Sequence, residues 1–133
     1  MDRYLLDTNA ASNLLRGNHP GLTKRSDSIA LDRQIIPSVV RAEFLFGWRA
    51  SPHFSRRIAE LQGFLSGYPT LPFDDAAAEE YGKLRAYLRQ RGTMIGPNDL
   101  LIASIALAND LVLVTHNVAE FEQVPNLRHE DWQ

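Results

Sequence analysis

The run Leu111-Val112-Leu113-Val114 is apolar at every position and includes two β-branched valines. A strand with water on one face alternates apolar and polar side chains, whereas a strand covered on both faces need not alternate. The run therefore predicts the central strand of a sheet that helices cover on both sides. That arrangement is typical of parallel sheets, because crossover helices pack on their faces.

The rest of the chain alternates strand and helix signals as a parallel sheet requires. Helix-starting residues follow the first strand at Thr8-Asn9, and Asp74-Asp75 precede a long helix with apolar residues at helical spacing. We predict one domain over residues 1–133, an α/β three-layer sandwich whose short, mostly parallel central sheet is flanked by helices. The predicted strands cover residues 3–7, 34–36, 111–115 and 127–132, with an extended segment at 70–73; the predicted helices cover 8–16, 19–33, 38–48, 54–65 and 76–91, another begins at 97, and a turn or short helix begins at 117.

Composition excludes several classes of site and of protein. The 133 residues are 44% hydrophobic and 23% charged, which is typical of a globular domain. Cysteine is absent, so disulfides, zinc–thiolate sites and cysteine nucleophiles are excluded. The longest near-apolar stretch, Leu100 to Ala108, is too short to span a bilayer, and the first residues do not form a signal peptide. We therefore expect a soluble cytoplasmic protein with no membrane partner.

Three carboxylates, Asp7, Glu43 and Asp99, are embedded in apolar sequence without a local cation to pair with them. An unpaired buried carboxylate is costly, so it shifts its pKa or binds a cation. Asp7 closes the first predicted strand, and sites in open parallel sheets collect beyond the carboxyl ends of strands. Carboxylates together with water and phosphate oxygens are the ligands that Mg²⁺ and Mn²⁺ prefer. The three acids therefore predict one shared metal site suited to phosphodiester hydrolysis.

Each acid also has a structural interpretation. Asp7 can cap the first helix, and Asp99 can be a first-turn residue that the helix dipole favours. Glu43 is expected on an apolar helix face beside Val39, Val40 and Phe46, where only a distant arginine could pair with it.

Other chemistry has weaker support. No glycine-lysine phosphate loop is present, so nucleotide triphosphate chemistry is not expected. Residues 16–57 contain eight basic side chains and three acidic ones, a composition suited to phosphate contacts but equally to a solvated surface of mixed sign. The four histidines fit no catalytic triad motif and are predicted as surface residues: His19, His53, His116 and His129.

The motifs and their order resemble the PIN-domain ribonucleases, specifically the VapC-type toxins of bacterial toxin–antitoxin pairs. The motifs span nearly the whole chain, and together they are more specific than any one of them. They are LLDTN at residues 5–9, PSVVRAE at 37–43, IGPNDLLIA at 95–103, LVTHN at 113–117, EF at 120–121 and LRHEDW at 127–132.

The resemblance implies that Asp7, Glu43 and Asp99 bind Mg²⁺, with Mn²⁺ as a substitute. Many members carry a fourth acid after the last buried strand, and Asn117 takes that position here, so the resemblance implies three carboxylates and a neutral fourth group. Thr115 could bond a phosphate or a carboxylate, or could simply end a strand. The family also implies an endoribonuclease that cleaves structured RNA such as tRNA, a small VapB-like antitoxin and a homodimer.

Two other functions stay open at this point. A PIN scaffold that binds RNA without cleaving it would explain the neutral residue at Asn117. A receiver-like or phosphatase-like domain could use Asp7 as a nucleophile, although such chemistry wants a lysine near the later strand ends and the chain has only Lys24 and Lys83.

Overall fold

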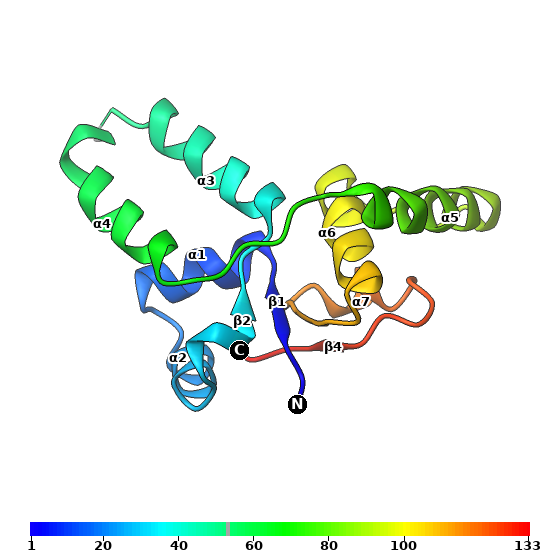
Figure 1. The fold of residues 1–133 in the computed structure, drawn as a ribbon, viewed down its shortest axis with the longest axis horizontal. Helices are drawn as coiled ribbons and strands as arrows, with labels where there is room; N and C mark the ends of the chain where they lie inside the picture. The colour runs from blue at the N-terminus through cyan, green and yellow to red at the C-terminus, as the bar shows by residue number, and fades with distance from the viewer. Residues whose placement is uncertain (53) are drawn as a thin grey trace.

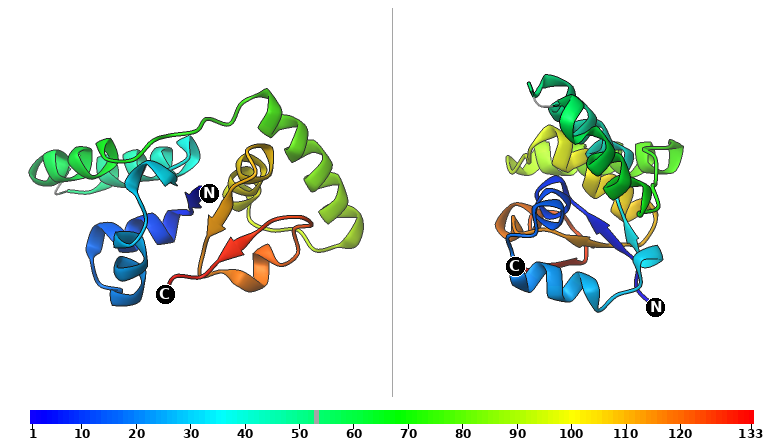
Figure 2. Two further views of the ribbon diagram at one scale, coloured as in Figure 1. Left: turned by 60° about the horizontal axis from the view of Figure 1, so that its bottom comes forward. Right: turned by 90° about the vertical axis from the view of Figure 1, so that its left-hand side faces the viewer.

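A computed structural model describes the backbone of residues 1–52 and 54–133 and the side chains of residues 1–52 and 57–133. Four short strands form one sheet in the order β2-β1-β3-β4, and every neighbouring pair is parallel. Helices lie on both faces of the sheet (Figures 1 and 2). The predicted α/β sandwich is confirmed. The strands are β1 (Tyr4–Leu6), β2 (Gln34–Ile35), β3 (Val112–Val114) and β4 (His129–Glu130).

The predicted helices are found, with one difference. The signals over residues 19–33 predicted a single helix. The chain instead ends helix α2 at Asp27 and then forms a short 3₁₀ turn, η1. Gly17 ends α1 with a φ of 69°, a left-handed conformation that glycine adopts without steric cost. The helices are α1 (Thr8–Arg16), α2 (Pro20–Asp27), η1 (Leu31–Arg33), α3 (Ser38–Ala50), α4 (Phe54–Ser66), α5 (Asp75–Arg91), α6 (Pro97–Ala108) and α7 (Val118–Phe121).

The core lies between the sheet and its helices. All three residues of β1 and of β3 are buried, and for β3 the apolar run predicted this burial. Helices α3 and α4 form a hairpin on one side of the molecule, and α5 packs along α6 on the other (Figure 1). The predicted extended segment at 70–73 forms no strand but runs beside β2 and the start of α3, where Leu71 O accepts a hydrogen bond of 2.9 Å from Ser38 N–H.

The aromatic residues of α3 divide between core and surface. Trp48 is half-buried and stacks on the buried ring of Phe44, with a centroid distance of 5.7 Å. Phe46 points outward with 71% of its surface exposed, and Leu45 beside it is exposed too. Helix α3 therefore presents a small apolar surface to solvent on the side away from the core.

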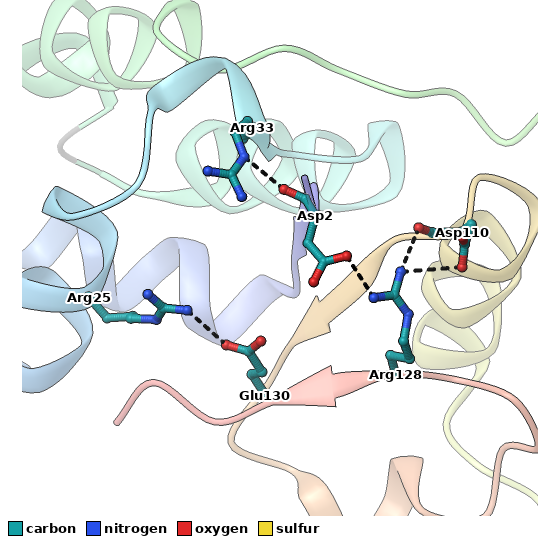
Figure 3. Close-up of polar contacts among 6 residues, drawn as sticks. All are labelled: Asp2, Arg25, Arg33, Asp110, Arg128 and Glu130. Atoms are coloured by element: carbon teal, nitrogen blue, oxygen red, sulfur yellow. Dashed lines mark hydrogen bonds and ion pairs between the residues drawn. The ribbon is translucent and has the colours of Figure 1, made fainter.

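Ion pairs and hydrogen bonds of arginines connect residues along the amino edge of the sheet (Figure 3). Arg128, directly before β4, donates to the carboxylate of Asp2 at 2.7 Å and to the backbone oxygen of Asp110 at 3.0 Å. Arg33, directly before β2, donates to the backbone oxygen of Asp2 at 2.8 Å. Residues that flank the amino ends of all four strands thus hold one another in place. The carboxyl edge, where β1 and β3 end, has a different composition.

Among the described helices, none is long and apolar enough to cross a bilayer. This agrees with the expectation that Leu100 to Ala108 is too short for that purpose. The surface prediction for His53 lies outside the described residues.

Candidate active site

Asp7 lies at the carboxyl end of β1 and has two hydrogen-bond partners. One carboxylate oxygen accepts from the Ala10 backbone N–H at 2.8 Å, so Asp7 caps α1. The Thr115 hydroxyl, at the end of the neighbouring strand β3, donates to the same carboxyl group. Asp7 is only 5% exposed, and this burial raises its pKa although both hydrogen bonds act in the opposite direction. The capping and the functional interpretations of Asp7 are therefore compatible.

Asp99 lies in the first turn of α6, as predicted, and it faces other acids. Its pKa is raised to about 7, first by burial, then by a hydrogen bond with Glu120 and by repulsion from Glu120 and Asp7. Two predicted metal-binding residues, Asp7 and Asp99, are thus brought together at one edge of the sheet. Carboxylates that repel one another in this way favour a bound cation or proton.

Glu120 was not among the acids predicted for the site, but it lies beside Gly96 and Asp99. It lies in α7, and one of its carboxylate oxygens accepts from the Gly96 backbone N–H at 2.7 Å. Asn117 donates to the other oxygen through its side-chain amide. Glu120, one helical turn after Asn117, therefore adds a carboxylate beside the expected neutral group. The signal was present as the spacing of Asn117 and Glu120, three residues apart on one helix face.

Asn117 and Thr115 support the acids. Asn117 is exposed and holds Glu120 through its amide. Its backbone N–H donates to the Thr115 hydroxyl oxygen at 3.0 Å. Because Thr115 in turn donates to Asp7, these two residues join the acid at the end of β1 to the acid in α7. Of the three roles open for Thr115, the carboxylate contact is the one observed.

Glu43 does not lie where the sequence predicted. The buried residues of α3 are Val40 and Phe44, and Glu43 projects from the exposed side. The expectation of an inward-facing, unpaired glutamate is therefore wrong, because the apolar stripe of α3 passes beside this position. One Glu43 oxygen accepts from the Asn98 side-chain amide at 2.8 Å, next to Asp99 in α6. Glu43 thus lies at the rim of the site.

The acids suit a divalent cation in their chemistry but do not form a closed cage. All are hard oxygen donors, and Gly96 leaves the space between them open: a β-carbon there would lie 3.4 Å from an Asp99 oxygen and 3.6 Å from a Glu120 oxygen. Within the described residues, no three acidic or histidine side chains are already arranged around one point for a metal ion. The residues fit Mg²⁺, which keeps water ligands and needs few protein carboxylates.

Comparison with known proteins decides the family. The family model described as PIN domain matches residues 4–127. The tRNA(fMet)-specific endonuclease VapC of Salmonella typhimurium is 36% identical over 99% of both chains. The chain is a PIN domain of the VapC family. Ribonuclease VapC2 of Rickettsia felis is another relative of this PIN domain, 37% identical over 97% of both chains.

Solved structures agree with this assignment. The PIN domain superposes with a TM-score of 0.92 on a chain of the DNA-bound VapBC structure from Salmonella typhimurium, with 34% identity and complete coverage of both chains. It superposes with a TM-score of 0.89 on a chain of VapBC2 from Rickettsia felis bound to a promoter DNA fragment, with 34% identity and 98% coverage of both.

Three arginines from the basic stretch over residues 16–57 of this PIN domain bind groups other than the acids of the site. Arg25 pairs with Glu130 at 3.5 Å (Figure 3), and Arg33 holds Asp2. Arg41 joins α3 to the end of α4, because its guanidinium donates to the Leu65 backbone oxygen at 3.1 Å. These contacts stabilise the fold and leave the phosphate-binding prediction without support from these three side chains.

Proposed function

We propose that this PIN domain is a Mg²⁺-dependent endoribonuclease that hydrolyses phosphodiester bonds of structured RNA and acts as the toxin of a toxin–antitoxin pair. The observation that carries the proposal is the meeting of Asp7, Asp99 and Glu120, from three distant segments, at one edge of a parallel sheet. The names of the relatives supply the substrate class, since they are ribonucleases and one is specific for tRNA(fMet).

In the proposed site Asp7, Asp99 and Glu120 hold Mg²⁺, and Mn²⁺ can replace it. Glu43 approaches from the rim through Asn98. An ion held there would activate a water and stabilise charge on the phosphoryl oxygens. The chain's own contribution is positioning: Ala10 and Thr115 orient Asp7, while Gly96 and Asn117 orient Glu120. Such second contacts fix the direction of each carboxylate before the substrate arrives.

The proposed partners are a small VapB-like antitoxin and a second copy of the chain. The related structures are complexes of a VapC-type chain with its VapB, and this supports an antitoxin here. The exposed apolar surface at Leu45 and Phe46 is available for a protein contact. Light scattering of the purified chain, alone and with the product of a neighbouring small reading frame, measures both assemblies.

The two alternative functions gain no added support from the contacts of Glu120 and the lysines. The non-catalytic scaffold depended on Asn117 as a neutral fourth position, and Glu120 supplies a charged group there. The receiver-like alternative needs a lysine near the strand ends; Lys24 lies in α2 and Lys83 in α5, and neither is among the groups that shift the pKa of Asp7. Metal-dependent hydrolysis remains the function that the arrangement of acids favours.

The decisive experiment compares RNA cleavage by matched variants. Total bacterial RNA is incubated with the wild type, Asp7→Asn, Asp99→Asn and Asp75→Asn, each with Mg²⁺ or with EDTA, and new RNA ends are mapped by sequencing. Asp75 is an exposed first-turn aspartate of α5 and serves as the control for Asp99. We expect cleavage by the wild type and Asp75→Asn with Mg²⁺ alone. Cleavage that persists in Asp7→Asn or in EDTA would refute the proposed mechanism.

A further inference from the structure

A histidine–aspartate pair lies at the same edge of the sheet as the acids. His116 follows β3, and Asp131 follows β4. The two strand ends are adjacent, because the Thr115 backbone N–H donates to the Glu130 backbone oxygen at 3.0 Å. The Nδ1 atom of His116 lies 2.9 Å from a carboxylate oxygen of Asp131. Neither residue belongs to the acid cluster that holds the metal in the proposed function.

The contacts of Asp131 fix which imidazole nitrogen of His116 faces away from it. The second carboxylate oxygen of Asp131 accepts from the Gln133 backbone N–H at 3.0 Å, so both of its oxygens have partners. Because Asp131 engages Nδ1, the Nε2 atom of His116 is the nitrogen left for another group, and 67% of the side chain is exposed. A carboxylate that holds one imidazole nitrogen orients the other, as in many histidine sites.

The pair is close enough to Asp7 to influence it electrostatically. The pKa of Asp7, raised chiefly by burial, is raised further by the charge of Asp131 and lowered by that of His116. When both of its ring nitrogens carry a proton, His116 is a cationic hydrogen-bond donor beside a group of acids. RNA phosphates are repelled by such acids, and the contacts of Arg25, Arg33 and Arg41 direct those side chains to other partners.

We propose that His116, oriented by Asp131, is a substrate-binding residue whose Nε2–H donates a hydrogen bond to a phosphate oxygen of the RNA next to the cleaved bond. This inference rests on the proposed function. Its chemistry is a charge-assisted hydrogen bond to phosphate, which is stronger than a neutral one. Asp131 acts through His116 and is a positioning residue.

The test uses two substitutions that each keep one nitrogen of the imidazole. The amide of His116→Asn can occupy the place of Nδ1 and keep the contact with Asp131, but it has no outward donor. The amide of His116→Gln extends toward the place of Nε2 and keeps a donor there. Initial rates of cleavage of a labelled stem-loop RNA give kcat and KM. We expect KM to rise about tenfold in His116→Asn, the loss of one charge-assisted bond, and distinctly less in His116→Gln.

Two further comparisons complete the experiment. His19→Asn is the control, because His19 is separated from Asp7 by the whole of α1, about 14 Å at 1.5 Å per residue. Asp131→Ala is expected to raise KM. Combining it with His116→Asn should not raise KM further, since both changes act on the same contact between residue 116 and the RNA phosphate. Thermal melting of each variant verifies folding.

The outcomes separate this inference from the proposed function. A wild-type KM in His116→Asn, or equal impairment by Asn and Gln, overturns the role of His116 while RNA cleavage by the wild type still supports the nuclease. Failure of the wild type to cleave any RNA overturns both.

Discussion

Asp99 and Glu120 are hydrogen-bond partners, although one begins α6 and the other lies in α7 beyond the central strand. Two carboxyl groups can share a hydrogen bond only when one of them carries a proton, and the pKa of Asp99, raised to about 7, is consistent with that proton. A divalent cation bound at the same oxygens would displace that proton. We therefore expect the stability of the chain to depend on pH and on added divalent cations.

The first prediction concerns pH and stability without metal. The pKa of Asp99 is about 7 in the fold and 3.8 without its surroundings, so the folded state holds the proton more tightly. As pH rises from about 4 to about 7, the unfolded chain loses the proton first, and the free energy of unfolding falls. Asp99→Asn removes this penalty, because its amide can donate to Glu120 at any pH.

We expect Asp99→Asn in EDTA to be about as stable as the wild type near pH 4 and about 1–2 kcal/mol more stable above pH 7. Urea unfolding across this pH range measures the difference. Asp75→Asn should show no such trend. A difference that shrinks as pH rises would contradict the sign of the Asp99 pKa shift.

The second prediction separates the two roles of Asp7. Asp7→Asn keeps an oxygen for the Ala10 N–H, whereas Asp7→Ala loses the cap of α1. We expect both variants to lose RNA cleavage, since both lose the charge. Asp7→Ala should unfold with about 1 kcal/mol less free energy than Asp7→Asn. Equal stability of the two variants in urea unfolding would show that the cap has no energetic role.

The third prediction concerns Glu120, which lies outside the acids expected from sequence. Glu120→Gln keeps the size of the side chain but removes the negative charge that lies next to Gly96 and Asp99. We expect metal affinity or cleavage to fall about 10–100-fold. Glu122→Gln, two residues away and exposed at the end of α7, is the control and should cleave like the wild type. Matching activity of the two variants would remove Glu120 from the site.

The fourth prediction concerns metal and melting. A cation that binds only the folded state stabilises it by about 2.7 kcal/mol at one hundred times its dissociation constant. We expect Mg²⁺ or Mn²⁺ to raise the melting temperature of the wild type and not that of Asp99→Asn. Because protons compete for Asp99, the increase should be smaller below pH of about 7. An unchanged melting temperature at saturating Mn²⁺ would argue against the metal site.

The amino acid sequence by itself determined the elements and their order. The uniformly apolar run that contains β3 predicted a buried parallel strand, and Asp74 marked a helix start that the structure retains. These signals are local, because capping, backbone conformation and burial pattern act within a few residues. The helix predicted over residues 19–33 failed at Asp27, where no such local signal was read.

Only the tertiary structure decided which acids meet. Glu43 and Glu120 each lie in a helix, but the packing of Val40 and Phe44 turns Glu43 outward, while the buried Phe121 anchors α7 so that Glu120 reaches Gly96. Sequence spacing gives the face of a helix and not the partner that it meets. The distance between side chains from separate segments depends on how the helices pack on the sheet, and this packing is a property of the whole chain.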